Sequence, residues 1–183
     1  FANAFLGVCH SMAHKLGAAF HLPHGLANAL LISNVVRYNA VDNPTKQTAF
    51  SQYDRPQARR RYAEIADHLG LTEASDRTGA KVEKLVAWID GLKAHLGIPA
   101  SIREAGVAEA DFLAAVKTIA VEAFDDQCTG ANPRFPLISE LEAVLTDSFY
   151  GRAWVEPPEM VAAKPIPALA EPASQKGPRK AAE

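Results

Sequence analysis

Four of the six histidines in this 183-residue chain lie within one short segment near its start. They are His10, His14, His21 and His24. Imidazole is the commonest protein ligand for transition metals and the usual proton carrier near neutral pH. His10 and His14 are four residues apart, so a helix would place them on one face. The Pro-His-Gly sequence around His24 breaks that helix and can turn a third imidazole back toward the first two. This pattern favours a metal site or a proton-transfer site.

Spacing alone leaves the roles of these histidines open. His10 and His24 are candidate metal ligands, although buried histidines often only satisfy hydrogen bonds. His14 could be a third ligand or a proton relay, and His21 is expected to be structural or peripheral. A catalytic metal site usually has at least three protein ligands, often including a carboxylate. The remaining ligands must therefore come from elsewhere in this chain or from sequence outside it.

A second polar segment, residues 125–134, reads Asp-Asp-Gln-Cys-Thr-Gly-Ala-Asn-Pro-Arg. Its composition suits a loop that lines a site, but a plain connector between two helices would read similarly. Asp125 and Asp126 are possible metal donors, although they lie far from the histidines in sequence. His68 and His95 fall near predicted helix ends, where solvent exposure or a contact with the helix dipole is expected.

The composition excludes several classes of protein. Hydrophobic residues make up 48% of the chain and charged residues 22%, which is typical of one soluble globular domain. The net charge of −2 gives no electrostatic reason to expect a nucleic-acid or membrane partner. No apolar run approaches the length of a membrane span. Two cysteines, Cys9 and Cys128, are expected to be free thiols in a reducing cytoplasm.

Hydrophobic periodicity predicts an all-α fold without strands. Helices are expected at about residues 2–19, 26–39, 57–69, 78–96, 109–124 and 137–150, with a loop at 45–54 and irregular chain at 125–136. Their inward faces are expected to include Ile32, Ile65, Leu69 and Leu92. The apolar start of the chain has no capping residue before it, so it reads as though cut inside a helix of a larger protein.

The predicted domain covers residues 1–155. From Glu156 onward, the composition changes to proline, alanine, lysine and glutamate. Such a segment buries too little apolar surface to offset the entropy of ordering it, so residues 156–183 are expected to form a disordered tail.

Two separated motifs carry a family resemblance. His10-x-x-x-His14-x-x-Gly17, followed by Pro23-His24-Gly25-x-x-Asn28-Ala29, resembles the signature of the iron-containing (group III) alcohol dehydrogenases. That family also has a Cys-Thr-Gly-x-Asn-Pro-Arg segment near its C-terminus, which residues 128–134 match. Over residues 1 to about 153, the chain is most similar to the subfamily of bifunctional aldehyde-alcohol dehydrogenases of fermenting bacteria.

The resemblance implies a subunit of two domains. An N-terminal α/β domain would bind NAD, and a C-terminal helical domain of the dehydroquinate synthase-like type would hold the metal. Iron would be bound by an Asp and a His from the upstream part and by two histidines that correspond to His10 and His24. His14 would lie close to the nicotinamide, as a proton relay or as a residue that positions the cofactor. The upstream Asp-x-x-x-His pair and the nucleotide-binding domain are not in this sequence.

The implied reaction interconverts a short-chain aldehyde, acetaldehyde in the first instance, and its primary alcohol, ethanol, during fermentation in the cytoplasm. It would use Fe²⁺, with zinc as the alternative metal, and NAD. The implied partners are the upstream nucleotide-binding part of the same polypeptide, the small substrate, and further copies of the protein in an oligomer or filament. The chain alone is expected to be inactive. Two other functions stay open: a helical self-assembly module, and a zinc-dependent hydrolase. The hydrolase is disfavoured because no Glu lies between His10 and His14.

Overall fold

The computed structural model describes residues 5–42 and 56–156. Within these ranges the chain is helical and contains no strand, which confirms the predicted all-α class. The helices are α1 (Val8–Phe20), α2 (His24–Asn39), α3 (Ala58–His68), α4 (Thr78–His95), α5 (Glu109–Phe124) and α6 (Ile138–Tyr150), with a short 3-10 helix, η2 (Thr129–Ala131). No helix in the described part of the chain is long and apolar enough to cross a membrane.

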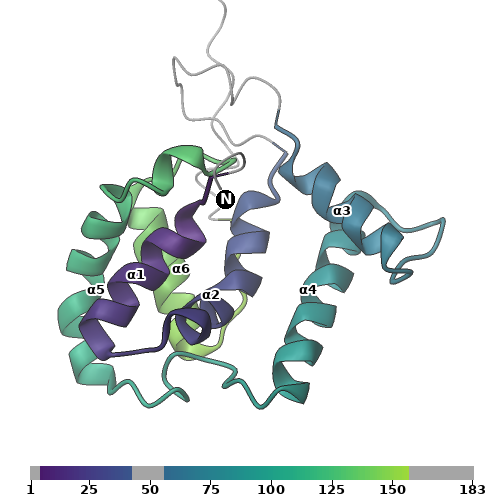
Figure 1. The fold of residues 1–183 in the computed structure, drawn as a ribbon. Helices are drawn as coiled ribbons and strands as arrows, with labels where there is room; N and C mark the ends of the chain where they lie inside the picture. The colour runs from purple at the N-terminus through teal and green to yellow at the C-terminus, as the bar shows by residue number, and fades with distance from the viewer. Residues whose placement is uncertain (1–4, 43–55, 157–183) are drawn as a thin grey trace, which may run out of the picture.

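Four of these helices form the main body of the molecule. Helix α1 packs against α2 and α5, and α6 packs against α5 and α2 (Figure 1). Helices α3 and α4 pack on each other and form an arm beside α2 (Figure 1). The histidine-rich helix α1 therefore has neighbours on two sides and keeps a partly exposed face.

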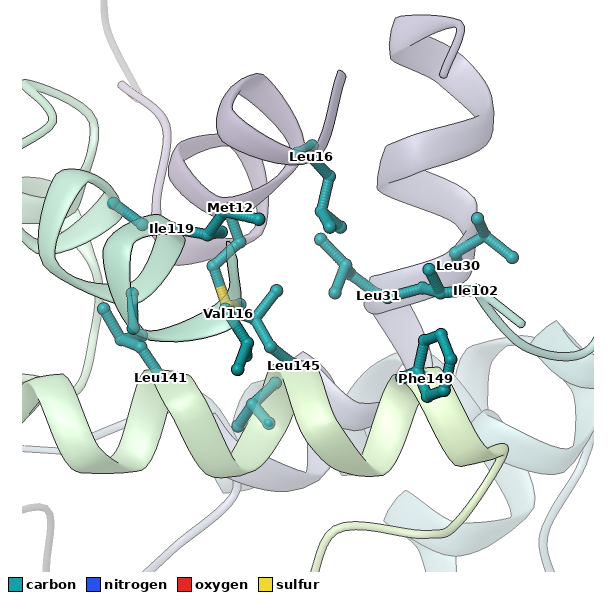
Figure 2. Close-up of a cluster of buried hydrophobic side chains, with 14 of the residues drawn as sticks. Met12, Leu16, Leu30, Leu31, Ile102, Val116, Ile119, Leu141, Leu145 and Phe149 are labelled. Carbon is teal, nitrogen blue, oxygen red and sulfur yellow. The ribbon is translucent and has the colours of Figure 1, made fainter. Parts of the chain in front are cut away.

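The core of the main body is built from apolar side chains of all four helices. Met12 and Leu16 of α1 point toward Leu31 of α2 and the row of apolar residues on α6 (Figure 2). Leu16 and Leu31 are fully buried. Shortening such a side chain to alanine typically costs about 2–5 kcal/mol, because the cavity closes only in part. The buried face of α1 fixes the direction in which its opposite face, with the histidines, can point.

Helix α1 begins later than its composition predicts. Residues 5–7 are not helical, and Phe5 has a positive φ of 56°. A Cβ on Gly7 would lie 2.7 Å from Oδ1 of Asn132, a buried residue of the loop after α5. The loop therefore occupies the space into which the helix would extend. The prediction of a helix from residue 2 is wrong for residues 5–7, and residues 1–4 lie outside the described part.

The arm is less buried than its apolar pattern predicts. Ile65, Leu69 and Leu92 are 42–47% exposed, and Ile32 of α2 is 38% exposed. Placing these four side chains in the core was wrong. The three on the arm are partly open because α3 and α4 mainly contact each other. The arm meets α2 in a small cluster around Val36 of α2 and Val82 and Val86 of α4. The expected loop at 45–54 and residues 157–183 of the expected tail lie outside the described residues.

Candidate metal centre

Three imidazole rings converge beside the N-terminal half of α1 and the start of α2. His10 and His14 lie one turn apart on α1, with ring centroids 6.2 Å apart. The His24 ring lies 5.3 Å from both of them, centroid to centroid. The sequence predicted this meeting of the three histidines, and the structure confirms it.

A tight turn between α1 and α2 brings His24 back over α1. His21 ends α1 in the left-handed conformation, with φ 55°, and Pro23 is extended with ψ 138°. A Cβ on Gly17 would lie 3.2 Å from the Leu22 carbonyl oxygen, so the turn closes directly over this glycine. The absence of a side chain at Gly17 and the restricted backbone of Pro23 thus determine the position of His24.

The surroundings of His10 favour its neutral form, which is the form of imidazole that binds metals. Burial of His10, together with the nearby rings of His24 and His14, lowers the His10 pKa. A second group orients His24: Nδ2 of Asn28 lies 3.2 Å from Nε2 and 3.0 Å from the carbonyl oxygen of His24. Neighbouring imidazole rings suit a transition metal, and His10 and His24 are the residues on α1 and α2 that could hold one.

A carboxylate from the loop after α5 joins His14. Oδ2 of Asp126 lies 3.4 Å from Nδ1 of His14 and 3.2 Å from Nζ of Lys15. Burial opposes ionisation of Asp126. Hydrogen bonds from Cys128, Lys15 and His14 outweigh that effect and lower the pKa of Asp126 to about 2. The carboxylate is therefore ionised at neutral pH and holds one face of the His14 ring.

The rest of this loop fastens it to α1 and α2. The Thr129 hydroxyl lies 2.7 Å from the hydroxyl of Ser11 and donates to the Ala123 carbonyl. Oδ1 of Asn132 accepts a hydrogen bond from the Val8 backbone N–H, the first amide of α1. The Asn132 amide also exchanges hydrogen bonds with the side chain of Asn39 at the end of α2.

Arg134 completes this attachment. It is buried, donates to the Tyr38 carbonyl at 2.9 Å, and forms ion pairs with Glu140 and Glu156. Glu156, assigned by composition to the tail, is thus held by the body of the protein. The loop at 125–134 therefore holds α1 and α2 in place through hydrogen bonds, and it also lines the site between them.

The other candidate residues are placed as follows. His21 is exposed and takes no part in the cluster, and His68 and His95 are the exposed last residues of α3 and α4, as expected. Asp126 reaches the site despite its distance in sequence, whereas Asp125 is exposed. Sequence reasoning missed the roles of Asn28 and Asn132. Asn28 acts through a hydrogen bond to His24, and Asn132 acts through hydrogen bonds to Val8 and Asn39. Hydrophobic periodicity gives no information about such hydrogen bonds.

The match to known families covers both motifs. The model for the C-terminal part of the Fe-containing alcohol dehydrogenase family matches residues 1–149. The chain belongs to the Fe-containing alcohol dehydrogenase family. It is 72% identical over 176 residues to the bifunctional aldehyde-alcohol dehydrogenase AdhE of Escherichia coli K12, which covers 96% of this chain and 20% of that protein. It is 51% identical over 148 residues to the aldehyde-alcohol dehydrogenase of Clostridium acetobutylicum, covering 81% of this chain and 17% of that protein.

Solved structures of alcohol dehydrogenases share the fold. A crystal structure of a 1,3-propanediol oxidoreductase aligns with a TM-score of 0.64 at 33% identity, over 79% of this chain and 33% of that one. The iron-containing alcohol dehydrogenase of Thermococcus thioreducens aligns with a TM-score of 0.63 at 29% identity, over 80% of this chain and 32% of that one. The present chain thus spans about a fifth of the bifunctional relatives and about a third of the single-function ones. The predicted resemblance and fold are confirmed.

Proposed function

We propose that this chain is the metal-binding part of an iron-dependent, NAD-linked alcohol dehydrogenase that interconverts acetaldehyde and ethanol. The observation that carries this proposal is the convergence of His10, His14 and His24 in a chain of the Fe-containing alcohol dehydrogenase family. The choice of substrate rests on similarity to the aldehyde-alcohol dehydrogenases of Escherichia coli and Clostridium acetobutylicum.

His10 and His24 are the proposed iron ligands in this chain. The lowered pKa of His10 keeps its ring nitrogen unprotonated at neutral pH, so its lone pair is available. Asn28 restricts rotation of the His24 ring, which reduces the entropy lost when both rings bind one ion. Bound iron would supply Lewis-acid polarisation of the oxygen atom of the aldehyde or alcohol.

His14 has a different proposed role, because its ring is already engaged. Its Nδ1 faces the ionised carboxylate of Asp126, which can hold a proton on that nitrogen and leave Nε2 free toward the site. A ring fixed in this way suits a group that positions the nicotinamide or carries a proton to and from the substrate oxygen. We therefore assign His14 to catalysis and cofactor positioning rather than to iron.

The remaining parts of the site are proposed to come from the same polypeptide upstream of this chain. The curated relatives are much longer, and an NAD-binding domain with an Asp and a His ligand would complete the iron site and bind the cofactor. The chain alone should consequently be inactive. Both cysteines are free thiols, which suits a reducing cytoplasm, where we place the reaction.

Self-assembly into an oligomer or filament can coexist with this function. Trp88 and Leu92 of α4 and the C-cap residue Leu96 recur every four residues and are 42–63% exposed, so they share an uncovered apolar side of the arm. Family membership disfavours the zinc-hydrolase alternative, which we set aside.

Single substitutions in the whole polypeptide test the assignment of the histidines. His10→Ala and His24→Ala should each lower iron content and abolish NADH-dependent reduction of acetaldehyde, since each removes a ligand. His14→Ala should keep iron and lose about a hundred-fold or more in turnover. His95→Ala, at the exposed end of α4, is the matched control and should change neither quantity. Full iron content with near-normal turnover in His10→Ala or His24→Ala would refute the ligand assignment, and iron loss in His14→Ala would make that residue a ligand.

A further inference from the structure

A second set of metal donors lies beside the three histidines. We propose that His14, Asp126 and Cys128 form a zinc-binding site separate from the iron ligands His10 and His24. One imidazole nitrogen, one carboxylate oxygen and one sulfur, one from each residue, all lie within 4.8 Å of one another. The three donors come from α1 and from the loop after α5, so the fold itself brings them together.

The spacing of the donors is close to that of a tetrahedral zinc site. Zinc–ligand bonds of about 2.0–2.3 Å separate neighbouring donors by roughly 3.3–3.8 Å. Nδ1 of His14 and Oδ2 of Asp126 are already 3.4 Å apart. Side-chain rotations that bring the sulfur of Cys128 about 1 Å closer would complete three corners. The fourth corner would be left for water or another small ligand.

The loop holds two of the donors in advance. Oδ1 of Asp126 accepts the Cys128 backbone N–H at 3.0 Å, which fixes the carboxylate and the thiol on one short turn. The next residue, Thr129, hydrogen-bonds through its hydroxyl to the Ala123 carbonyl at the end of α5 and to the Ser11 hydroxyl of α1. Zinc binding there therefore orders little additional chain, and a site that is ordered in advance loses less entropy on binding.

The chemistry of the donors selects the metal. A thiolate together with an imidazole and a carboxylate suits zinc and disfavours magnesium or calcium, which take oxygen ligands. The iron pair contains no sulfur, so the two sites differ in kind. Zinc would displace the Cys128 thiol proton, and the neutral His14 ring would carry its proton on Nε2 so that Nδ1 can bind the metal. Zinc would also displace the ammonium group of Lys15, which now lies 3.2 Å from Asp126. The Lys15 side chain is 26% exposed and can move into solvent.

Occupation of this site would take His14 away from catalysis. The inhibition that follows rests on the proposed function, in which His14 serves the cofactor and the substrate, whereas zinc binding itself rests on the geometry alone. Zinc should therefore inhibit an enzyme that still contains its full iron.

The test uses Co²⁺ as a spectroscopic substitute for zinc in the whole polypeptide, with iron in place. Thiolate coordination gives Co²⁺ a charge-transfer absorption in the near ultraviolet that histidine and carboxylate ligands do not give. Wild-type protein and Cys9→Ser should both show this band, and Cys128→Ser should lose it. Cys9 is the matched control, because it is the other free cysteine of this chain and its thiol instead contacts the Asn28 carbonyl. His10→Ala should keep the band, even if the iron assignment proves wrong.

A second measurement links the site to inhibition. Cys128→Ser should require at least ten-fold more zinc for half-inhibition than Cys9→Ser, with iron content unchanged and far-ultraviolet circular dichroism confirming the fold of both variants. Absence of the band in the wild type, or its persistence in Cys128→Ser, would overturn the zinc site. Zinc inhibition that parallels loss of iron and is equal in the two variants would show exchange at the iron site instead.

Discussion

Removing the side chain of Asn132 should strongly destabilise this fold. Asn132 is 2% exposed, and its amide makes four hydrogen bonds: from the Val8 N–H, with both polar atoms of Asn39, and to the Arg134 carbonyl. A net contribution of about 1 kcal/mol for each gives a loss of about 4 kcal/mol for Asn132→Ala, because the partners stay buried without water. This is a large part of the 5–15 kcal/mol of stability typical of a domain.

Urea denaturation of the 183-residue chain at low concentration can measure this loss. Trp154 is buried near Arg134, whereas Trp88 is 43% exposed. In a Trp88→Phe background, the fluorescence of Trp154 therefore reports on the region around Asn132 and Arg134. Gln127→Ala is the matched control, since it removes an amide from the same loop at an exposed position and should change the free energy of unfolding by less than about 0.5 kcal/mol. A loss below about 1 kcal/mol in Asn132→Ala, or one equal to that of the control, would refute the argument.

Three further outcomes are expected. Folding lowers the pKa of Asp126 from 3.8 to about 2, so its ionised carboxylate should stabilise the protein by about 2 kcal/mol at pH values well above 4. The advantage of wild type over Asp126→Asn in urea denaturation should vanish as the pH falls toward 2, and a difference independent of pH would contradict this. Gly17→Ala should change the melting temperature little, because the gain in helix propensity offsets the close approach of the Leu22 carbonyl. The same substitution should weaken iron binding, because the added methyl group displaces His24. Unchanged iron affinity would show that the turn tolerates a methyl group. Truncation after Glu156 should leave activity and melting temperature unchanged. Truncation after Val155 should lower the melting temperature by a few degrees, because Arg134 loses an ion partner. Equal melting temperatures in the two truncated proteins would show that the Arg134–Glu156 ion pair does not stabilise the fold.

Local patterns in the sequence were sufficient to predict the helices and the meeting of the three histidines. The four-residue spacing of His10 and His14 is a short-range signal that places both on one face of a helix. The proline before His24 is another short-range signal, which predicts a break between the two helices. The position of Asp126 beside His14 was not predictable in this way, since the two residues are separated by most of the domain. The same holds for the start of α1, where a distant asparagine rather than local propensity determines the first helical residue.

Exposure of the arm was also beyond reach of the sequence. The apolar spacing of Ile65, Leu69 and Leu92 fits a buried face equally well, because periodicity identifies the side of a helix that prefers burial but not what covers it. Only the contacts of α3 with α4 show that this side is partly open.

The unequal attachment of the two histidine-bearing segments has a kinetic consequence. The first half of helix α1 is held by Asn132, Thr129 and Asp126, whereas His24 lies at the exposed first turn of α2 beside a glycine. We therefore expect metal to be captured first by His10 and completed by His24, and to dissociate in the reverse order. The lifetime of a bound ion would then be set by how often the first turn of α2 frays. Substitutions that stiffen this turn, such as Gly25→Ala, should slow metal release more than they change the rate of capture.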